Sequence, residues 1–492
     1  MTADPYTQLL ERCREVYVLQ TTASALHWDL ETYLPPKAVA FRAEQLSYLE
    51  GKAHRLFTDP SVGDWIRACE DIQPSPETGR AANVREWRRS YDRAVKIPAA
   101  LVEEAQRVFT LSREAWKEAR AEADFTKFAP HLVKIVDLTR QKADLWGYQE
   151  SPYDALLEEY EPGTTAGSLR PLFGELQAAL VPLVERLARD PVPADYLKGH
   201  YPEASQAALN ARIAQTVGYD FEGGRIDTTT HPFATSLGPE DHRITTRYDE
   251  QLFQVSLYGV LHETGHALYE QGLDKTAAGT PLGAARSLGI HESQSRLWEN
   301  HVGRTGTFWA RWYQTAAEHL PDLRRFTPDE VARGVKRVAP SFIRVEADEV
   351  TYDLHILLRF DIELALVEQR LAIGDLPAAW NERFEQLFGL KVPNDRLGVL
   401  QDIHWSLGAL GYFPTYSLGN LNAAQLMAAA ERSIPDLPQQ LAVGEYARLL
   451  DWLRKNVHQH GQRFETRQLM AEATGESTQA RHRIEYLRKK YT

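Results

Sequence analysis

The chain has 492 residues, of which 43% are apolar and 25% charged, and its formal net charge is −12. This length exceeds one ordinary compact core and suffices for two lobes. The negative charge argues against a nucleic-acid partner, and no apolar run of 18 or more residues is present to span a membrane. The N-terminus lacks a secretory signal pattern, and the two cysteines, Cys13 and Cys69, form no disulfide framework. We therefore expect a cytoplasmic protein.

The first part of the chain predicts one helix after another. Apolar residues recur at helical spacing over residues 6–34, until Pro35 and Pro36 end the pattern, and again over residues 101–125. A proline-rich segment between Asp190 and Pro202 marks a break. We expect an N-terminal helical lobe over about residues 1–200 and a second lobe over about residues 201–492.

The segment over about residues 224–250 differs, because it is rich in threonine, glycine and β-branched residues. It predicts two or three short strands with a turn near Gly238 and Pro239. Helices then resume and continue to the C-terminus. We expect the longest of them to end near Gly374, and a glycine- and tyrosine-rich loop over residues 408–420. The fold class is therefore mainly α, with one small sheet.

The motif HETGH follows this sheet and spans residues 262–266. On a helix, positions i and i+4 lie on one face, so His262 and His266 can both reach one metal ion. Glu263 flanks the same face and can take a proton from a water that the metal activates. Gly265 is expected to keep the helix surface open beside His266. This is the arrangement of the HExxH metallopeptidase motif, and the alternative is a pair of buried histidines satisfied by hydrogen bonds.

A third protein ligand must come from elsewhere, since catalytic zinc usually has three. His291 and Glu292 begin the segment HESQ and point about 100° apart on a helix, so one of them is expected to face the metal. From the residues alone Glu292 is favoured only slightly, and either residue could instead be a cap or a surface residue. Glu299 and His301 lie further along and could hydrogen-bond a ligating histidine.

Six separated motifs together resemble those of the carboxypeptidase Taq family of metallocarboxypeptidases. In the order of the family they are HPF (231–233), DHRIT (241–245), HETGH (262–266), HESQ (291–294), IRVEAD (343–348) and GVLQDIHW (398–405). The resemblance covers most of the chain, so the whole of it is expected to form one peptidase unit.

The resemblance implies a site and an architecture. The metal would be one zinc ion per chain, which cobalt can replace, bound by His262, His266 and Glu292, with Glu263 as the general base. The fold would consist of two helical lobes that form a saddle-shaped groove. The activity would be removal of single residues from peptides with a free C-terminus, with broad specificity, by a homodimer.

A carboxypeptidase also needs a cation for the terminal carboxylate of its substrate, and arginine matches a carboxylate with two parallel hydrogen bonds. Arg344 and Arg243 are the candidates, with Gln401 as a neutral partner. For Arg344 the alternative is a surface ion pair with Asp348, four residues on.

A donor for the oxyanion is also needed, and His404, Tyr412 and Tyr416 can each provide one, although the tyrosines could equally be packing residues. The strand around residues 241–248 could pair with an extended peptide by strand addition, or could serve only the sheet.

Two other functions remain open. One is an oligopeptidase or dipeptidase-type exopeptidase with a similar groove, which activity on a blocked C-terminus would reveal. The other is a helical binding scaffold that keeps a zinc ion without turnover. The presence of Glu263 argues against the scaffold.

Overall fold

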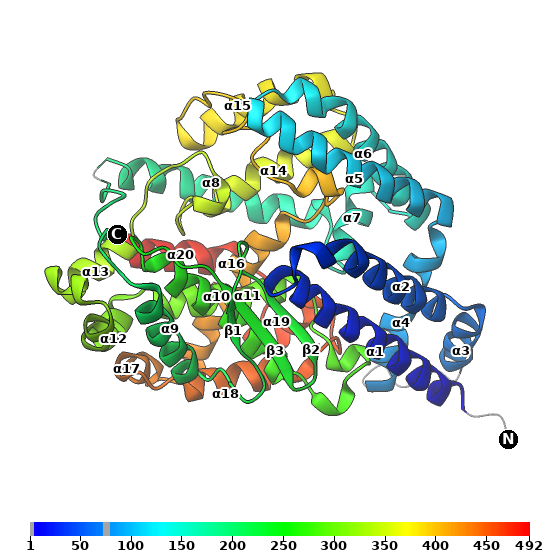
Figure 1. Ribbon diagram of the computed structural model, residues 1–492, viewed down its shortest axis with the longest axis horizontal. Helices are drawn as coiled ribbons and strands as arrows, with labels where there is room; N and C mark the ends of the chain where they lie inside the picture. The colour runs from blue at the N-terminus through cyan, green and yellow to red at the C-terminus, as the bar shows by residue number, and fades with distance from the viewer. Residues whose placement is uncertain (1–3, 72–78, 190) are drawn as a thin grey trace.

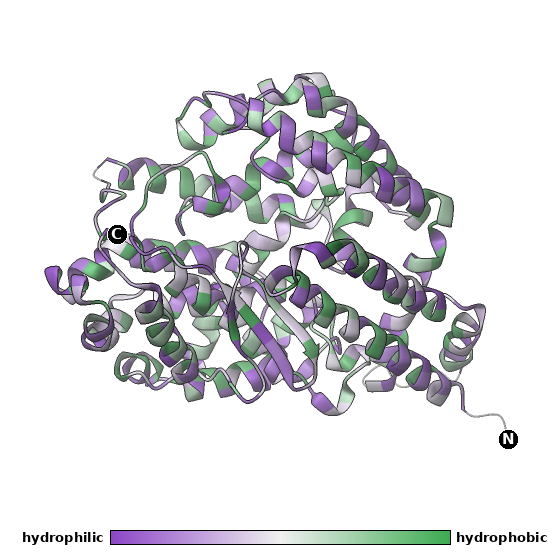
Figure 2. Ribbon diagram, viewed as in Figure 1, coloured by the Kyte–Doolittle hydropathy of each residue, from purple (hydrophilic) through white to green (hydrophobic). Residues whose placement is uncertain are grey.

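A computed structural model describes residues 4–71, 79–189 and 191–492 of the chain. Helices make up most of it (Figure 1), and hydrophilic and hydrophobic residues alternate along them, as in amphipathic helices (Figure 2). The first half contains α1 (Pro5–Thr32), α2 (Val39–Phe57), α3 (Pro60–Asp71), α4 (Gly79–Lys96), α5 (Ala99–Glu122), α6 (Phe125–Trp146), α7 (Pro152–Tyr160), α8 (Ala166–Leu187) and α9 (Glu203–Val217). After the sheet come α10 (Gln254–Gly272), α11 (Leu288–Arg296), α12 (Gly306–His319), α13 (Pro328–Val335), α14 (Tyr352–Val367), α15 (Leu376–Phe388), α16 (Pro414–Ser433), α17 (Leu437–Val443), α18 (Ala447–Asn456), α19 (Thr466–Thr474) and α20 (Ala480–Tyr491).

Three short strands form the sheet that the sequence predicted. They are β1 (Ile226–Thr228), β2 (Ala234–Gly238) and β3 (Asp241–Thr246), in the order β1-β3-β2. β3 pairs with β1 in parallel, Ile226 opposite Ile244, and with β2 antiparallel, Ala234 opposite Ile244. Ile244 packs with Val260 and Ala267 of α10, so the sheet lies against the HExxH helix. The predicted fold class, mainly α with a small sheet beside that helix, is confirmed.

The central position of β3 corrects one expectation. The strand around residues 241–248 was a candidate for pairing with a peptide, but β3 has a strand on each side. Its backbone groups are therefore committed to β1 and β2, and strand addition requires a free edge.

Besides the cluster at the sheet, three apolar clusters among the described residues hold the helices together. One joins α6, α7 and α8 to α14, α15 and the start of α16. A second surrounds α9, α10 and α12 and reaches α19. A third, smaller cluster belongs to α1, α3 and α4 and contains both cysteines. The division of the chain near residue 200 stays a prediction.

Two predicted elements differ from the structure. The helix expected to be the longest after the sheet, α14, has 16 residues and ends at Val367, whereas α16 has 20. α14 ends early because Gln369 adopts a left-handed φ of 58° and the Arg370 N–H turns back to the Ala365 carbonyl, which closes the helix. The loop expected over residues 408–420 is half helix, because Pro414 starts α16 at a position that favours proline.

Candidate metal centre and its surroundings

α10 and α11 lie side by side behind the strands (Figure 1) and bring three potential metal ligands together. The Nε2 atom of His262 lies 3.6 Å from Oε2 of Glu292, and Nε2 of His266 lies 3.4 Å from the same oxygen. All three ligand atoms are within 4.8 Å of one another. Two ligands of a tetrahedral zinc ion, each about 2.1 Å from it, are about 3.4 Å apart. The donor set of two nitrogens and one oxygen and its spacing therefore fit such an ion.

Each of the two histidines has a second partner that sets its orientation. Nδ1 of His262 lies 3.0 Å from Oε2 of Glu299. Nδ1 of His266 lies 2.5 Å from Nδ1 of His291, whose Nε2 is 2.9 Å from Oε1 of Glu270. An imidazole that offers Nε2 to a metal carries its proton on Nδ1, so these contacts select the tautomer that can bind. Burial also lowers the pKa of His266 to about 4, which keeps its ring neutral.

These contacts distinguish between the residues that the sequence offered as alternatives for the third ligand and for the partner of a ligating histidine. His291 lies behind His266 and outside the group of ligand atoms. Of the two candidate partners for a histidine, Glu299 makes the contact, whereas His301 stacks on the Tyr486 ring with centroids 3.8 Å apart. Sequence reasoning missed Glu270, although its position four residues after His266 on the same helix was a usable signal.

Glu292 is buried and firmly held. It accepts hydrogen bonds from Nε of Arg296 at 2.6 Å and from the Ser295 hydroxyl at 3.1 Å. Burial by itself raises the pKa of this carboxyl, but the charges of Arg296 and His262 outweigh burial and hold the pKa well below its usual range. Gly419 of α16 makes room, since a Cβ there would lie 2.5 Å from Cγ of Glu292.

Gly265 was expected to keep the helix surface open beside His266, but its effect in the structure is different. A Cβ at this position would lie 2.5 Å from the Gln294 carbonyl oxygen and 2.6 Å from Cα of Ser295. The glycine therefore lets α10 and α11 approach closely, and does not leave an open surface. This close approach is what brings Glu292 to the two histidines.

Glu263 is only 7% exposed, and no side-chain hydrogen bond to its carboxylate is present in the part of the chain that the structure describes. Burial raises its pKa to about 7; the His262 charge acts in the opposite direction, and the nearby Glu292 adds to the rise. A carboxylate with a pKa near neutrality is well matched to accepting and returning a proton.

Arg344 lies in a buried group of charged and aromatic residues, not on the surface. Its Nε and Nη2 atoms are each 2.9 Å from Oδ1 of Asp402, and its Nη1 donates to the Tyr352 hydroxyl at 2.9 Å. The surface ion pair with Asp348 is wrong, because Asp348 instead accepts backbone hydrogen bonds, from Ala339 among others. Tyr352 also links this group to the metal centre, since the Arg296 guanidinium lies 4.5 Å from the centre of its ring.

The aromatic candidates gather around Arg344. His404 packs against Phe413 and Tyr412, with ring centroids 4.5 Å and 5.4 Å apart, and Tyr412 lies 5.4 Å from Tyr416. The Arg344 guanidinium is 5.1 Å from the centre of the Tyr416 ring. Burial lowers the pKa of His404 to about 4, so its ring is neutral. The structure thus brings His404, Tyr412, Tyr416 and Arg344 into one cluster.

Gln401 and Arg243 have other partners. The Gln401 side chain accepts from the Arg344 backbone N–H at 2.9 Å and donates to the Phe342 carbonyl at 2.9 Å, so it joins two loops. Arg243 on β3 forms a two-pronged ion pair with Asp241 and lies 4.3 Å from the centre of the Trp28 ring of α1. The described contacts of Arg243 are thus with the sheet and α1, away from the Arg344 cluster.

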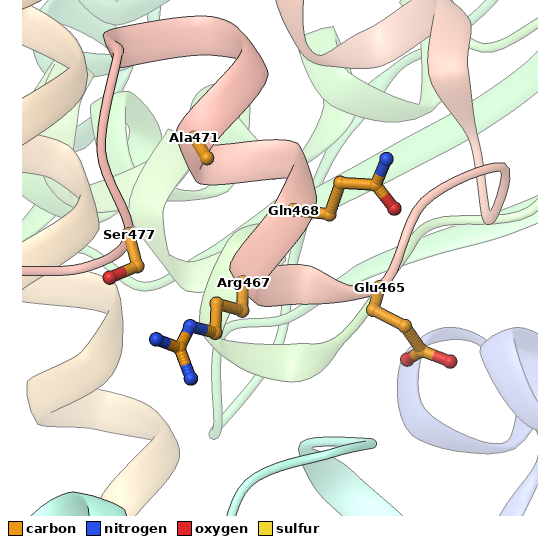
Figure 3. A pocket seen from close by; sticks show the side chains of 5 residues that line it. All are labelled: Glu465, Arg467, Gln468, Ala471 and Ser477. Atoms are coloured by element: carbon orange, nitrogen blue, oxygen red, sulfur yellow. The ribbon is translucent and has the colours of Figure 1, made fainter.

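Two hollows lie apart from the ligand atoms. The larger, about 520 Å³, is formed by Glu465, Arg467, Gln468, Ala471 and Ser477 (Figure 3), none of which is a predicted site residue. The smaller, about 420 Å³, is bordered by α4, α7 and the start of α11, and His291 contributes to its wall. Among the described helices, none combines the length and the apolar character that crossing a bilayer requires.

Comparison with known proteins gives the family. The carboxypeptidase Taq (M32) metallopeptidase family matches residues 8–491. The chain belongs to this family. It is 43% identical to thermostable carboxypeptidase 1 of Thermus thermophilus, over 99% of this chain and 98% of that protein. Its identity to carboxypeptidase 1 of Bacillus subtilis is 38%, over 95% of this chain and 94% of the relative.

Solved structures of the family share the fold. An M32 carboxypeptidase from Deinococcus radiodurans superposes with a TM-score of 0.94 at 41% identity, over 99% of this chain and 98% of the other. A Pyrococcus furiosus carboxypeptidase superposes with a TM-score of 0.97 at 35% identity, over 100% of both chains. The M32 protein described here is accordingly a metallocarboxypeptidase, a hydrolase of peptide bonds.

Proposed function

We propose that this M32 enzyme is a zinc carboxypeptidase that removes single amino acids from peptide C-termini with broad specificity. The observation that carries the proposal is the convergence of the His262, His266 and Glu292 ligand atoms beside the buried Glu263 carboxylate. Cobalt is expected to replace zinc, because it accepts the same nitrogen and oxygen donors.

The three ligands would hold the ion, and Glu263 would move the proton. When bound, zinc supplies a Lewis acid that polarises the scissile carbonyl and lowers the pKa of a water molecule to about 7. Glu263 accepts the proton of the attacking water and passes it to the leaving amine. Its pKa of about 7 supports both steps, because neither protonation state is strongly disfavoured at neutral pH.

Arg344 would bind the terminal carboxylate of the substrate. A guanidinium has five N–H donors, and the described hydrogen bonds and ion pairs of Arg344 engage its Nε, Nη1 and Nη2 atoms with Asp402 and Tyr352. The same Asp402 also pairs with Arg359 at 2.5 Å, so two arginines share one carboxylate. With His404 neutral, this cluster has an excess positive charge that an incoming carboxylate would neutralise.

His404, Tyr412 and Tyr416 are the candidates for stabilising the oxyanion. Burial raises the pKa of both tyrosine hydroxyls, so they stay protonated and can donate a hydrogen bond. Arg243 and Gln401 remain weaker candidates for the substrate, because their described partners are within the protein.

The homodimer, the cytoplasmic location and the preference for a free C-terminus belong to the same proposal. A homodimer would give a mass near twice 55.8 kDa in light scattering. The alternative, an oligopeptidase or dipeptidase-type exopeptidase, would not depend on a free terminal carboxylate.

One assay tests the proposal. Metal-free protein is incubated with a peptide as the free acid and as the C-terminal amide, each with and without zinc or cobalt, and the products are read by mass spectrometry. We expect stepwise loss of single C-terminal residues from the free acid only, and only with metal. Cleavage inside the chain, or equal cleavage of the amide, would favour the alternative.

A further inference from the structure

The segment that carries Glu299 is a π-helix, η4 (Leu297–Gly303), which continues directly from α11. Its wider turn is seen in the hydrogen bond from the Arg304 N–H to the Glu299 carbonyl, five residues back, at 3.0 Å. Short π-helical turns are rare and often occur at functional sites. Here the turn presents the Glu299 carboxylate to Nδ1 of His262.

One backbone carbonyl in the second half of this turn accepts its hydrogen bonds from another helix. The last carbonyls of a helix lack partners within it, and cations are favourable there. Asn300 is buried, and its carbonyl oxygen accepts hydrogen bonds from Lys490 Nζ at 2.9 Å and from the Tyr486 hydroxyl at 3.1 Å. Both donors are on α20, near the C-terminal end of the chain (Figure 1).

α20 is itself fixed at this point. Lys490 Nζ lies 2.6 Å from Oε2 of Glu349, and its side chain is only 8% exposed. Glu349 also accepts from Tyr491 at 2.8 Å and from Arg483 at 3.1 Å. Tyr486 makes a second contact with η4, because its ring stacks on His301. α20 is therefore held by Glu349 and contacts the turn at Asn300 and His301, the two residues that follow Glu299.

We propose that Lys490 and Tyr486 are positioning residues for the metal centre: by holding the Asn300 carbonyl they fix the π-helical turn, and so the Glu299 carboxylate that orients His262. This inference rests on the metal site of the proposed function and adds a contact about 190 residues away in the sequence. Neither residue belongs to the group of potential metal ligands found among the described residues. Their effect is on how strongly His262 binds.

The test measures metal affinity in Lys490→Met, which keeps the length of the side chain and removes its donors. Lys489→Met is the matched control, because Lys489 is the exposed neighbour on the same helix. Zinc dissociation constants are measured by competition with a chromophoric chelator, and the visible spectrum of the cobalt-loaded protein reports the geometry around the ion. Groups that orient a ligating histidine typically contribute 10- to 100-fold in affinity.

We expect zinc binding about tenfold weaker in Lys490→Met and an altered cobalt spectrum, with a smaller change in Tyr486→Phe, which retains the ring. Lys490→Arg should recover part of the loss, since it restores a donor and a charge. Wild-type affinity and spectrum in Lys490→Met would overturn the inference. If the wild-type protein itself bound no zinc, the proposed function would fail instead.

A double variant distinguishes lost positioning from lost stability as the cause of weaker zinc binding. Losing Lys490 leaves Glu349 without one of its partners, which destabilises a buried carboxylate. The double variant Lys490→Met, Glu349→Gln removes that charge as well, and thermal unfolding of the metal-free protein checks that it is folded. Weakened zinc binding in the double variant supports a positioning role, whereas restored binding assigns the single-variant loss to instability and overturns the inference.

Discussion

The metal centre and the Arg344 cluster are neighbouring groups of buried charges, joined through Tyr352, yet they are built in opposite ways. In the metal centre three ligand atoms face one another, and the carboxylates of Glu263, Glu292 and Glu299 outnumber the guanidinium groups of Arg296 and Arg304. In the Arg344 cluster every charge has a protein partner, and two guanidinium groups share Asp402. One group thus gathers metal-binding atoms at one point, and the other has an excess of positive charge.

The difference reflects the kind of ligand each group would hold. A cation that stays bound can satisfy ligand atoms that face one another at all times. A substrate carboxylate comes and goes, so its binding group needs satisfied hydrogen bonds in its absence, because an unpaired buried charge is costly. Converging ligand atoms thus support the proposed metal centre, and the excess positive charge supports the proposed carboxylate site.

The largest expected effect is a loss of catalysis without a loss of metal from the metal centre. Glu263→Gln keeps the size of the side chain but cannot accept a proton. We expect kcat to fall by about 10²- to 10⁴-fold, since that is the usual contribution of general acid–base catalysis, while zinc content stays near one per chain. A variant with more than about a tenth of wild-type kcat would assign the base elsewhere.

The next prediction separates a metal ligand from the residue behind it. Glu292→Ala removes a ligand, so zinc affinity and activity should fall together. His291→Ala removes only the partner of His266, so zinc affinity should fall about 10- to 100-fold and most of the metal should stay bound when zinc is in excess. Metal analysis of both purified variants checks this, and the reverse order of affinities would exchange the two roles.

A third prediction concerns the Arg344 cluster. Arg344→Ala removes the proposed charge-assisted contact with a free C-terminus, of about 1.5–3 kcal/mol, so kcat/KM for free-acid peptides should fall about 10- to 150-fold. Asp402 keeps Arg359 as its partner, so the variant should fold. Slow cleavage of the C-terminal amide should barely change.

Arg344→Lys serves as the control for this prediction. A lysine provides a point charge without the two-pronged geometry, so it should recover only part of the loss. An equal fall on free acid and amide would mean that Arg344 supports the fold or the chemistry in general, and the carboxylate site would then be sought at Arg243.

The smallest expected effect is a pH dependence of stability, caused by a carboxyl group beneath the loop that carries His404 and Tyr412. Glu363 of α14 accepts hydrogen bonds from Trp405 Nε1, the Gly411 N–H and the Tyr153 hydroxyl, and burial raises its pKa to about 7. Between about pH 4.5 and pH 7, Glu363 keeps a proton in the folded state that it has released in the unfolded state. The contribution of Glu363 to the free energy of unfolding therefore falls as the pH rises through this range.

Glu363→Gln removes this titration. The stability of the metal-free variant relative to wild type should therefore rise by about 2 kcal/mol between pH 5 and pH 8, measured by denaturant unfolding at both values. A stability difference that is constant with pH would show that Glu363 does not titrate in this range. Zinc affinity should be unchanged, in contrast to the variants of the metal centre.

Local periodicity was enough to predict much of this protein. The spacing of His262 and His266 places them on one face of a helix whatever surrounds them, because a turn takes 3.6 residues. The strands of the sheet and the end of α1 before Pro35 likewise follow from residue types acting on their own backbone. The early end of α14 at Val367 was missed, since a left-handed residue other than glycine, here Gln369, gives no signal in the sequence.

Only the tertiary structure decided which side chains from distant segments contact one another. The residues alone favoured Glu292 over His291 only slightly, and the choice depends on how closely α11 approaches α10 at Gly265. That β3 is the central strand, that Asp402 rather than Asp348 pairs with Arg344, and that Lys490 contacts the turn behind His262 are all results of packing between distant segments. The sequence fixes which face of an element a side chain occupies, whereas the neighbour of that face depends on the packing of the whole chain.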